Sequence, residues 1–146
     1  MSDALRLKAE DGPGLEVLSA ALQDSVLQAG DLSYDARSRR FTALVNRFRW
    51  EKAGQRGPFE RVRAAFAVES VTAVQSAKLN RTDKRAVASV LSLAFEPDGE
   101  PPGGVLRVLL AGGGEVRLNL ECIDALLMDM GSPWPTPRKP NHESAQ

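Results

Sequence analysis

Four arginines have the side-chain chemistry and the spacing best suited to binding. They alternate along two neighbouring segments of strand-like composition: Arg47, Arg49, Arg61 and Arg63. Alternate residues of a strand project from one face, and the planar guanidinium group suits phosphate or carboxylate recognition. The four are therefore candidate ligand-binding residues for nucleic acid or a phosphorylated ligand. The alternative interpretation is a solvated basic stripe that prevents edge pairing.

Aromatic residues beside these arginines bear on the interpretation. Phe48 and Trp50 could offer stacking surfaces to a base. Phe48 and Trp50 stand at even positions of the segment, whereas the apolar residues before them, up to Val45, stand at odd positions. In a regular strand the two sets would therefore point to opposite faces. A β-bulge near Val45 would place both apolar sets in the core. We therefore expect the aromatic rings to be buried and the side chains of Arg47 and Arg49 to face solvent.

The other reactive residue types do not combine into a catalytic or metal site. His142, the only histidine, lies in a polar segment, and Cys122, the only cysteine, follows the apolar parity of a predicted strand. A catalytic triad needs a histidine held by a third group, and the carboxylates lack the spacing of a metal-binding loop. The glycines at 112–114 precede a strand, whereas a phosphate-binding loop precedes a helix. The sequence therefore predicts no enzyme activity, no metal and no cofactor.

Length and composition are those of one small globular domain. The 146 residues are 42% hydrophobic and 26% charged, which allows a core without disulfides. Net charge is zero, but residues 37–85 hold 13 basic and four acidic residues. Such asymmetry fits a phosphate-binding face, or two surfaces that attract each other after folding. We expect no signal peptide and no membrane span, and the single cysteine fits a reducing cytoplasm.

Hydrophobic periodicity predicts one helix followed by seven strands. The helix spans residues 14–24, with an Asp11 cap and an apolar face of Leu15, Leu18 and Leu22. A short strand is possible at residues 5–7. Period-two patterns predict the seven strands over residues 26–34, 39–50, 62–69, 71–78, 89–95, 105–110 and 116–122.

The C-terminal part is predicted to contain a hairpin, a helix and a tail. The alternation on both sides of residues 112–114 predicts the hairpin. Residues 132–146 contain four prolines and predict an extended tail anchored by Trp134. Residues 1–131 would then form a single α+β domain. A helix over residues 123–130, ended by Gly131, is predicted from four apolar residues on one face: Ile123, Leu126, Leu127 and Met130.

Seven strands and a final helix match the element order of pleckstrin-homology-like barrels. In that fold two antiparallel sheets cross at a right angle and a helix plugs one end. The predicted fold class is therefore α+β and mostly antiparallel β. It is a pleckstrin-homology-like seven-stranded barrel or sandwich with a C-terminal helix and an extra N-terminal helix.

Several short segments together form a distinctive combination. They are Leu22-Gln23-Asp24-Ser25-Val26, Gly30-Asp31-Leu32-Ser33-Tyr34, Arg39-Arg40-Phe41, Leu44-Val45-Asn46-Arg47-Phe48-Arg49-Trp50-Glu51, Ala111-Gly112-Gly113-Gly114, Glu121-Cys122-Ile123 and Trp134-Pro135-Thr136. With these segments the chain resembles an uncharacterised alphaproteobacterial family, domain of unknown function 2948, from about Leu5 to His142. The resemblance implies a bacterial cytoplasmic protein of unassigned function and brings no catalytic residues.

Three classes of function are compatible with these observations. The first is a non-enzymatic binding or adaptor module with a protein or peptide partner, by analogy with pleckstrin-like barrels. The second is binding of nucleic acid or a phosphorylated ligand through the arginine face. The third is an enzyme whose site has no familiar motif. The first is the function that we expect.

Overall fold

Antiparallel strands make up most of the protein. The computed structural model describes residues 4–54, 58–79, 82–137 and 139–140. Within these residues there are ten strands, one α-helix, α1 (Gly12–Leu22), and two short 3₁₀ helices, η1 (Ala29–Asp31) and η2 (Trp50–Lys52). The strands are β1 (Arg6–Ala9), β2 (Val26–Gln28), β3 (Leu32–Asp35), β4 (Arg40–Phe48), β5 (Phe59–Val68), β6 (Val71–Ala77), β7 (Val87–Pro97), β8 (Gly104–Leu110), β9 (Glu115–Leu120) and β10 (Ala125–Thr136).

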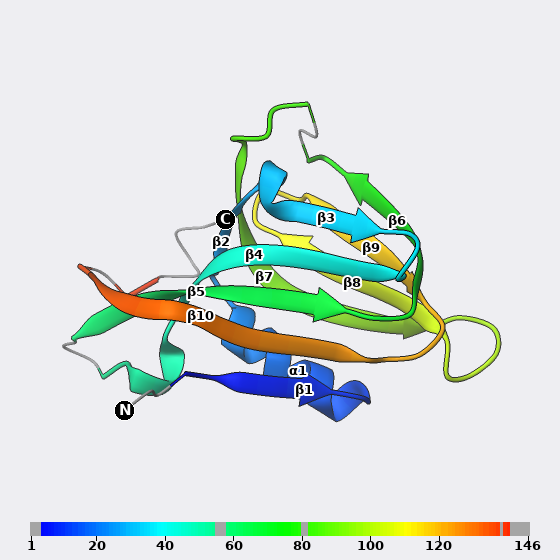
Figure 1. Cartoon of the computed structure of the whole chain (residues 1–146), viewed down its shortest axis with the longest axis horizontal. Coiled ribbons are helices and arrows are strands. Elements are labelled where there is room, and N and C mark those ends of the chain that lie inside the picture. Colours follow the sequence, from blue (N-terminus) through cyan, green and yellow to red (C-terminus); the bar gives the residue numbers. More distant parts are fainter. Residues whose placement is uncertain (1–3, 55–57, 80–81, 138, 141–146) are drawn as a thin grey trace.

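The strands form one sheet that folds over on itself. Its order is β1-β10-β5-β4-β2-β7-β8-β9-β6, and β3 pairs with β4 beside this path. Figure 1 shows β1, β10, β5, β4 and β3 lying across β7, β8, β9 and β6. We call the first group the front sheet and the second the back sheet. The short strand β2 joins them because it pairs with both β4 and β7.

The core lies between the two sheets and is completed by α1. The helix begins after Asp11, whose carboxylate accepts a hydrogen bond from the Gly14 amide at 2.8 Å, as an N-cap should. Leu15, Leu18 and Leu22 project from one face of α1 into the core. The helix predicted over residues 14–24 is therefore present and lies against β1 and β7.

The helix predicted over residues 123–130 is wrong, because residues 125–136 form β10. This strand pairs with β1 on one side and β5 on the other. Ala125 and Leu127 are buried, whereas Met128 and Met130 are exposed, which is the period of a strand. Helix propensity is a weak local preference, and here the ladders on both sides of β10 override it. β10 also includes residues 132–136, the first part of the predicted tail.

The predicted seven-stranded barrel with helices at both ends is also wrong. The described residues form one open antiparallel sheet of ten strands, with a single α-helix near the N-terminus. The segment predicted as one strand over residues 26–34 is divided by η1 into β2 and β3. The predicted hairpin is present as β8 and β9, and Gly112 and Gly113 have positive φ angles in its turn. No helix among the described residues is long and apolar enough to cross a membrane.

The burial pattern of β10 makes a prediction that separates a strand from a helix. Leu127 is fully buried in the core and Leu126 lies on the opposite face of the strand, half buried. We expect Leu127→Ala to lower the free energy of unfolding by about 2–5 kcal/mol and Leu126→Ala to lower it clearly less. Urea denaturation of both variants measures the difference. Equal losses would contradict the strand, because in the predicted helix both leucines share one face.

Candidate functional site

Arg47 lies inside the protein. The pairing of β4 with β5 is continuous from Phe41 to Phe48, without a bulge. Arg47 therefore keeps the inward parity of Val45, and its side chain is fully buried. Arg49, which follows the end of β4, is only 5% exposed. The predictions of a bulge and of solvent-facing side chains at Arg47 and Arg49 are wrong.

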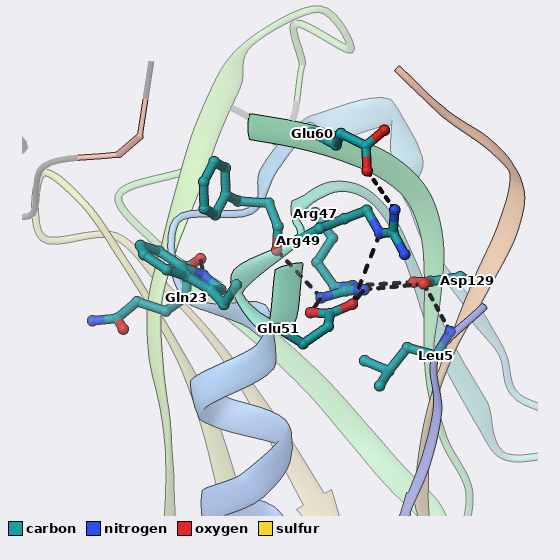
Figure 2. A network of polar contacts seen from close by, with 9 residues as sticks. Leu5, Gln23, Arg47, Arg49, Glu51, Glu60 and Asp129 are labelled. Atoms are coloured by element: carbon teal, nitrogen blue, oxygen red, sulfur yellow. Dashed lines mark hydrogen bonds and ion pairs between the residues drawn. The ribbon is translucent and has the colours of Figure 1, made fainter. Parts of the chain in front are cut away.

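All N–H donors of the Arg47 guanidinium are used within the protein (Figure 2). Nη1 and Nη2 donate to the two carboxylate oxygens of Glu51 at 2.9 and 2.7 Å. Nε and Nη2 donate to the two carboxylate oxygens of Asp129, both at 3.0 Å. Nη1 also donates to the backbone carbonyl of Phe48 at 3.2 Å. Because arginine has five N–H donors, this guanidinium has none left for a ligand.

Asp129 carries the network on to the N-terminal segment. Its side chain is 2% exposed, and Oδ2 accepts a hydrogen bond from the Leu5 amide at 2.9 Å. The Asp129 amide donates to the Leu5 carbonyl, also at 2.9 Å. Two anions around one cation need further donors for their oxygens, and the Leu5 amide is such a donor. Arg47 thereby links β4, η2, β10 and the residue before β1.

Opposing effects set the protonation of this cluster. Burial lowers the pKa of Arg47, but the hydrogen bonds to Glu51 and Asp129 outweigh it, and the pKa lies above its ordinary value. Burial raises the pKa of Glu51, but the hydrogen bond and charge of Arg47 outweigh it, and the pKa lies below 4.5. Both groups are therefore charged at neutral pH.

Arg49 lies next to this cluster and is also paired. Its Nη1 donates to Glu60 at 2.6 Å, and its Nε lies 3.9 Å from Glu51 (Figure 2). The neighbouring Trp50 donates its indole N–H to the Gln23 carbonyl at 2.8 Å, at the end of α1. The Trp50 contact holds the segment after β4 against the end of α1. The ion pairs with Glu60 and Glu51 match the charge of Arg49 inside the protein.

Arg61 and Arg63 lie on the opposite, outer face of the front sheet. Arg61 donates to the backbone carbonyls of Asp24 and Asn46 at 3.1 and 3.0 Å. Burial lowers its pKa, and the charge of Asp24 opposes that shift. Arg63 donates to the side chains of Asn46 and Asp31, both at 3.1 Å. The four predicted arginines thus form two pairs on opposite faces, and their role in ligand binding stays a prediction.

The aromatic residues form a small cluster of their own. Phe48 is buried, and its ring centroid lies 4.6 Å from that of Trp50 and 6.0 Å from that of Phe59. The Arg61 guanidinium lies 5.8 Å from the centre of the Phe48 ring, within cation–π range. Phe48 is on the outward parity of β4 and lies outside the main core cluster. Its ring is therefore buried, as expected, but is not part of the core between the sheets.

The remaining candidates from the sequence do not come together. Cys122 is half buried. His142 lies outside the described residues, and within the part of the chain that the structure describes there is no cluster of metal-binding side chains. Trp134 belongs to β10 opposite Arg61 and is 37% exposed. The predicted packing of this ring on the protein is therefore partial.

A cleft between β3 and β6 was not predicted from the sequence. β3 pairs only with β4, and β6 only with β9, among the described residues. At one end the Tyr34 hydroxyl donates to the Val71 carbonyl at 2.6 Å and connects the strands. Beyond this contact the strands enclose a cleft of about 340 Å³. Its lining residues are Ala29, Gly30, Leu32, Phe41, Val74, Gln75, Ser76, Leu79, Lys84 and Val116.

The cleft combines an apolar floor with a few polar groups. Leu32, Phe41 and Val116 of the lining also contact the core. The Ser76 hydroxyl is buried and has no hydrogen-bond partner among the described residues. Lys84 is exposed and supplies a positive charge. The one sequence feature that could have indicated the cleft is Ser76, a polar residue two positions after Val74 and therefore on the same inward face of β6.

Comparison with known proteins places the chain in a family. The model of the family described as Protein of unknown function (DUF2948) matches residues 5–142, nearly the whole chain. The chain belongs to this family. No curated protein and no solved structure matches it. The resemblance noted from the sequence is thus confirmed, and the function of this DUF2948 protein has to be argued from its own geometry.

The Arg47 network predicts a large loss of stability when its cation is removed. Arg47→Met removes the counter-ion of Asp129 and leaves Glu51 only Arg49, at 3.9 Å, and breaking such a buried pair costs about 3–5 kcal/mol. We expect chemical denaturation to show this loss. The stability of Arg47→Lys should lie between those of wild type and Arg47→Met. Lysine keeps the positive charge but lacks the planar guanidinium that forms paired hydrogen bonds with a carboxylate. Arg117→Met, at an exposed position of β9, is the control and should change stability by about 0.5 kcal/mol or less.

Glu51 predicts a specific dependence of stability on pH. Its pKa in the folded protein lies below its ordinary value of 4.5. A lowered carboxyl pKa stabilises the fold above the unfolded pKa, and this contribution is lost as the pH falls through the folded pKa. We therefore expect wild type to be more stable than Glu51→Gln at pH 7, with a difference that shrinks below pH 4.5. Urea denaturation over this range measures it, and a constant difference would contradict the ion pair.

Proposed function

We propose that this protein is a binding module rather than an enzyme. Its ligand would be an extended peptide segment of a partner protein, held in the cleft between β3 and β6. The observation that carries the proposal is that two strand edges, each unpaired among the described residues, face a cleft with an apolar floor. Such edges readily accept a further strand.

Strand addition explains how a peptide would gain affinity and register. The backbone of an extended peptide can hydrogen-bond to an exposed sheet edge, while alternate side chains enter pockets below it. Here β6 would supply the edge, and Leu32, Phe41 and Val116 would contact the inward side chains. The gap between β3 and β6 is already bridged at Tyr34 and Val71, so a peptide would continue the contact between the strands.

The polar groups of the cleft set the expected chemistry of the peptide. Ser76 lacks a partner among the described residues and is buried, so a ligand that bonds to its hydroxyl would remove an energetic cost. Lys84 favours an acidic side chain or a terminal carboxylate nearby. The volume of about 340 Å³ is at the lower end of the range for ligand sites, about 300–1,000 Å³. A short apolar segment with one acidic group fits these features.

Filling the cleft provides the test. Ser76→Phe places a ring in the cleft, whereas Ala77→Phe places the same ring on the exposed face of the same strand. Peptides would be selected from a phage-displayed library on the wild-type protein and their affinities measured by fluorescence anisotropy. We expect Ser76→Phe to weaken binding at least tenfold and Ala77→Phe to leave it unchanged.

Two results would contradict this proposal. The first is a failure to select any peptide that binds wild type. The second is a selected peptide that binds Ser76→Phe and wild type with equal affinity, while circular dichroism shows both variants to be folded. Hydrogen exchange provides an independent readout, because strand addition should slow exchange at amides of β6 and not at those of β1.

A further inference from the structure

The outer face of the front sheet carries an exposed apolar surface away from the cleft. On β10, Leu126, Met128 and Met130 project outward, while Leu127 and Asp129 project inward. Met128 and Met130 are 39% and 42% exposed. Large apolar side chains that line up along a strand on a solvent-facing surface indicate an interaction site more strongly than isolated ones.

The strand register extends this surface across three strands. Met128 lies opposite Ala65 of β5, and Ala65 lies opposite Leu44 of β4. In the neighbouring row, Leu126 lies opposite Ala67. Directly opposed residues share a face of a sheet, so these side chains form a continuous apolar area. We call it the methionine face, and its residues are Leu44, Ala65, Ala67, Leu126, Met128 and Met130.

No helix among the described residues covers the methionine face. Figure 1 shows the front sheet nearest the viewer and α1 behind β1, and α1 contributes its leucines to the core on the inner side. In most domains a sheet face with apolar residues is covered by a further layer, often a helix. The area spans about 13 Å along β10 and about 10 Å across three strands. These dimensions match the apolar stripe along about two and a half turns of a helix.

The charges around the methionine face are basic. Arg6 and Lys8 of β1 are exposed, lie opposite Met128 and Leu126, and form no ion pair with a described residue. Arg63, opposite Met130, donates to Asp31 but is still 35% exposed. The rim along β1 therefore has two positive charges that nothing in the described part of the protein balances.

We propose that the methionine face binds an amphipathic helix of a partner protein, with acidic residues beside its apolar stripe. This site is separate from the cleft and goes beyond the function proposed above. Methionine side chains adapt to differently shaped apolar partners, and acidic flanks would meet Arg6 and Lys8. A second copy of this chain fits less well, because a twofold interface presents the same surface on both sides and would bring basic rims together.

The methionine methyl groups give a direct readout. The chain has only three methionines, Met1, Met128 and Met130, so two of the three methyl signals of a ¹³C-methionine-labelled protein report on this face. The probes are three synthetic 18-residue peptides. One is a helix with leucines on one side and glutamates on the other, one has lysines in place of the glutamates, and one has the leucines and glutamates scrambled.

The leucine–glutamate helix should shift the Met128 and Met130 signals to saturation, more weakly at higher salt. The other two peptides should bind at least tenfold more weakly. The double variant Arg6→Glu/Lys8→Glu should lose at least tenfold in affinity, whereas Arg117→Glu on the exposed face of β9 should lose none. Ser76→Phe should also bind this peptide normally, which separates the two proposals.

Three outcomes would overturn the proposal. One is the absence of shifts with the leucine–glutamate helix. Another is equal binding of the lysine peptide or of Arg6→Glu/Lys8→Glu, because charge would then play no part. The third is a change in the Met128 and Met130 signals with protein concentration alone, together with a doubled mass in sedimentation. That result would make a second copy of the chain the occupant.

Discussion

The buried guanidinium of Arg47 is the interaction on which the front sheet depends. Its five N–H donors bind two carboxylates and a carbonyl, and those acceptors come from η2, β10 and the end of β4. Asp129 then binds the Leu5 amide. A buried ion pair gains little net stability over apolar packing, but an unmatched member would be costly. The network therefore connects η2, β10, the end of β4 and Leu5 at this end of the sheet, and its charges are matched in this arrangement.

Local patterns predicted most strands and failed where long-range pairing decides. The alternation of β5, β6 and β9 gave the correct element type because one face of each strand is buried. The first half of β10, residues 125–130, has the composition of a helix, and the neighbouring strands β1 and β5 come from distant parts of the chain. The parity of Arg47 was visible in the sequence. The sequence did not show, however, that Asp129, 82 residues away, lies beside Arg47 and helps to match its charge.

Among the described residues, several polar and apolar side chains stand on unexpected faces, and the surroundings of three such places separate their roles. Arg47 is inward, and every donor of its guanidinium is satisfied within the protein. Among the described residues, the Ser76 hydroxyl is buried without a hydrogen-bond partner, and Met128 and Met130 point outward with no further layer over them. Real proteins break local patterns mainly at strained or functional positions. A violation that the chain itself compensates explains the fold, whereas an uncompensated one points to a partner. On this physical criterion we propose the cleft and the methionine face, rather than the Arg47 network, as the places where this protein meets other molecules.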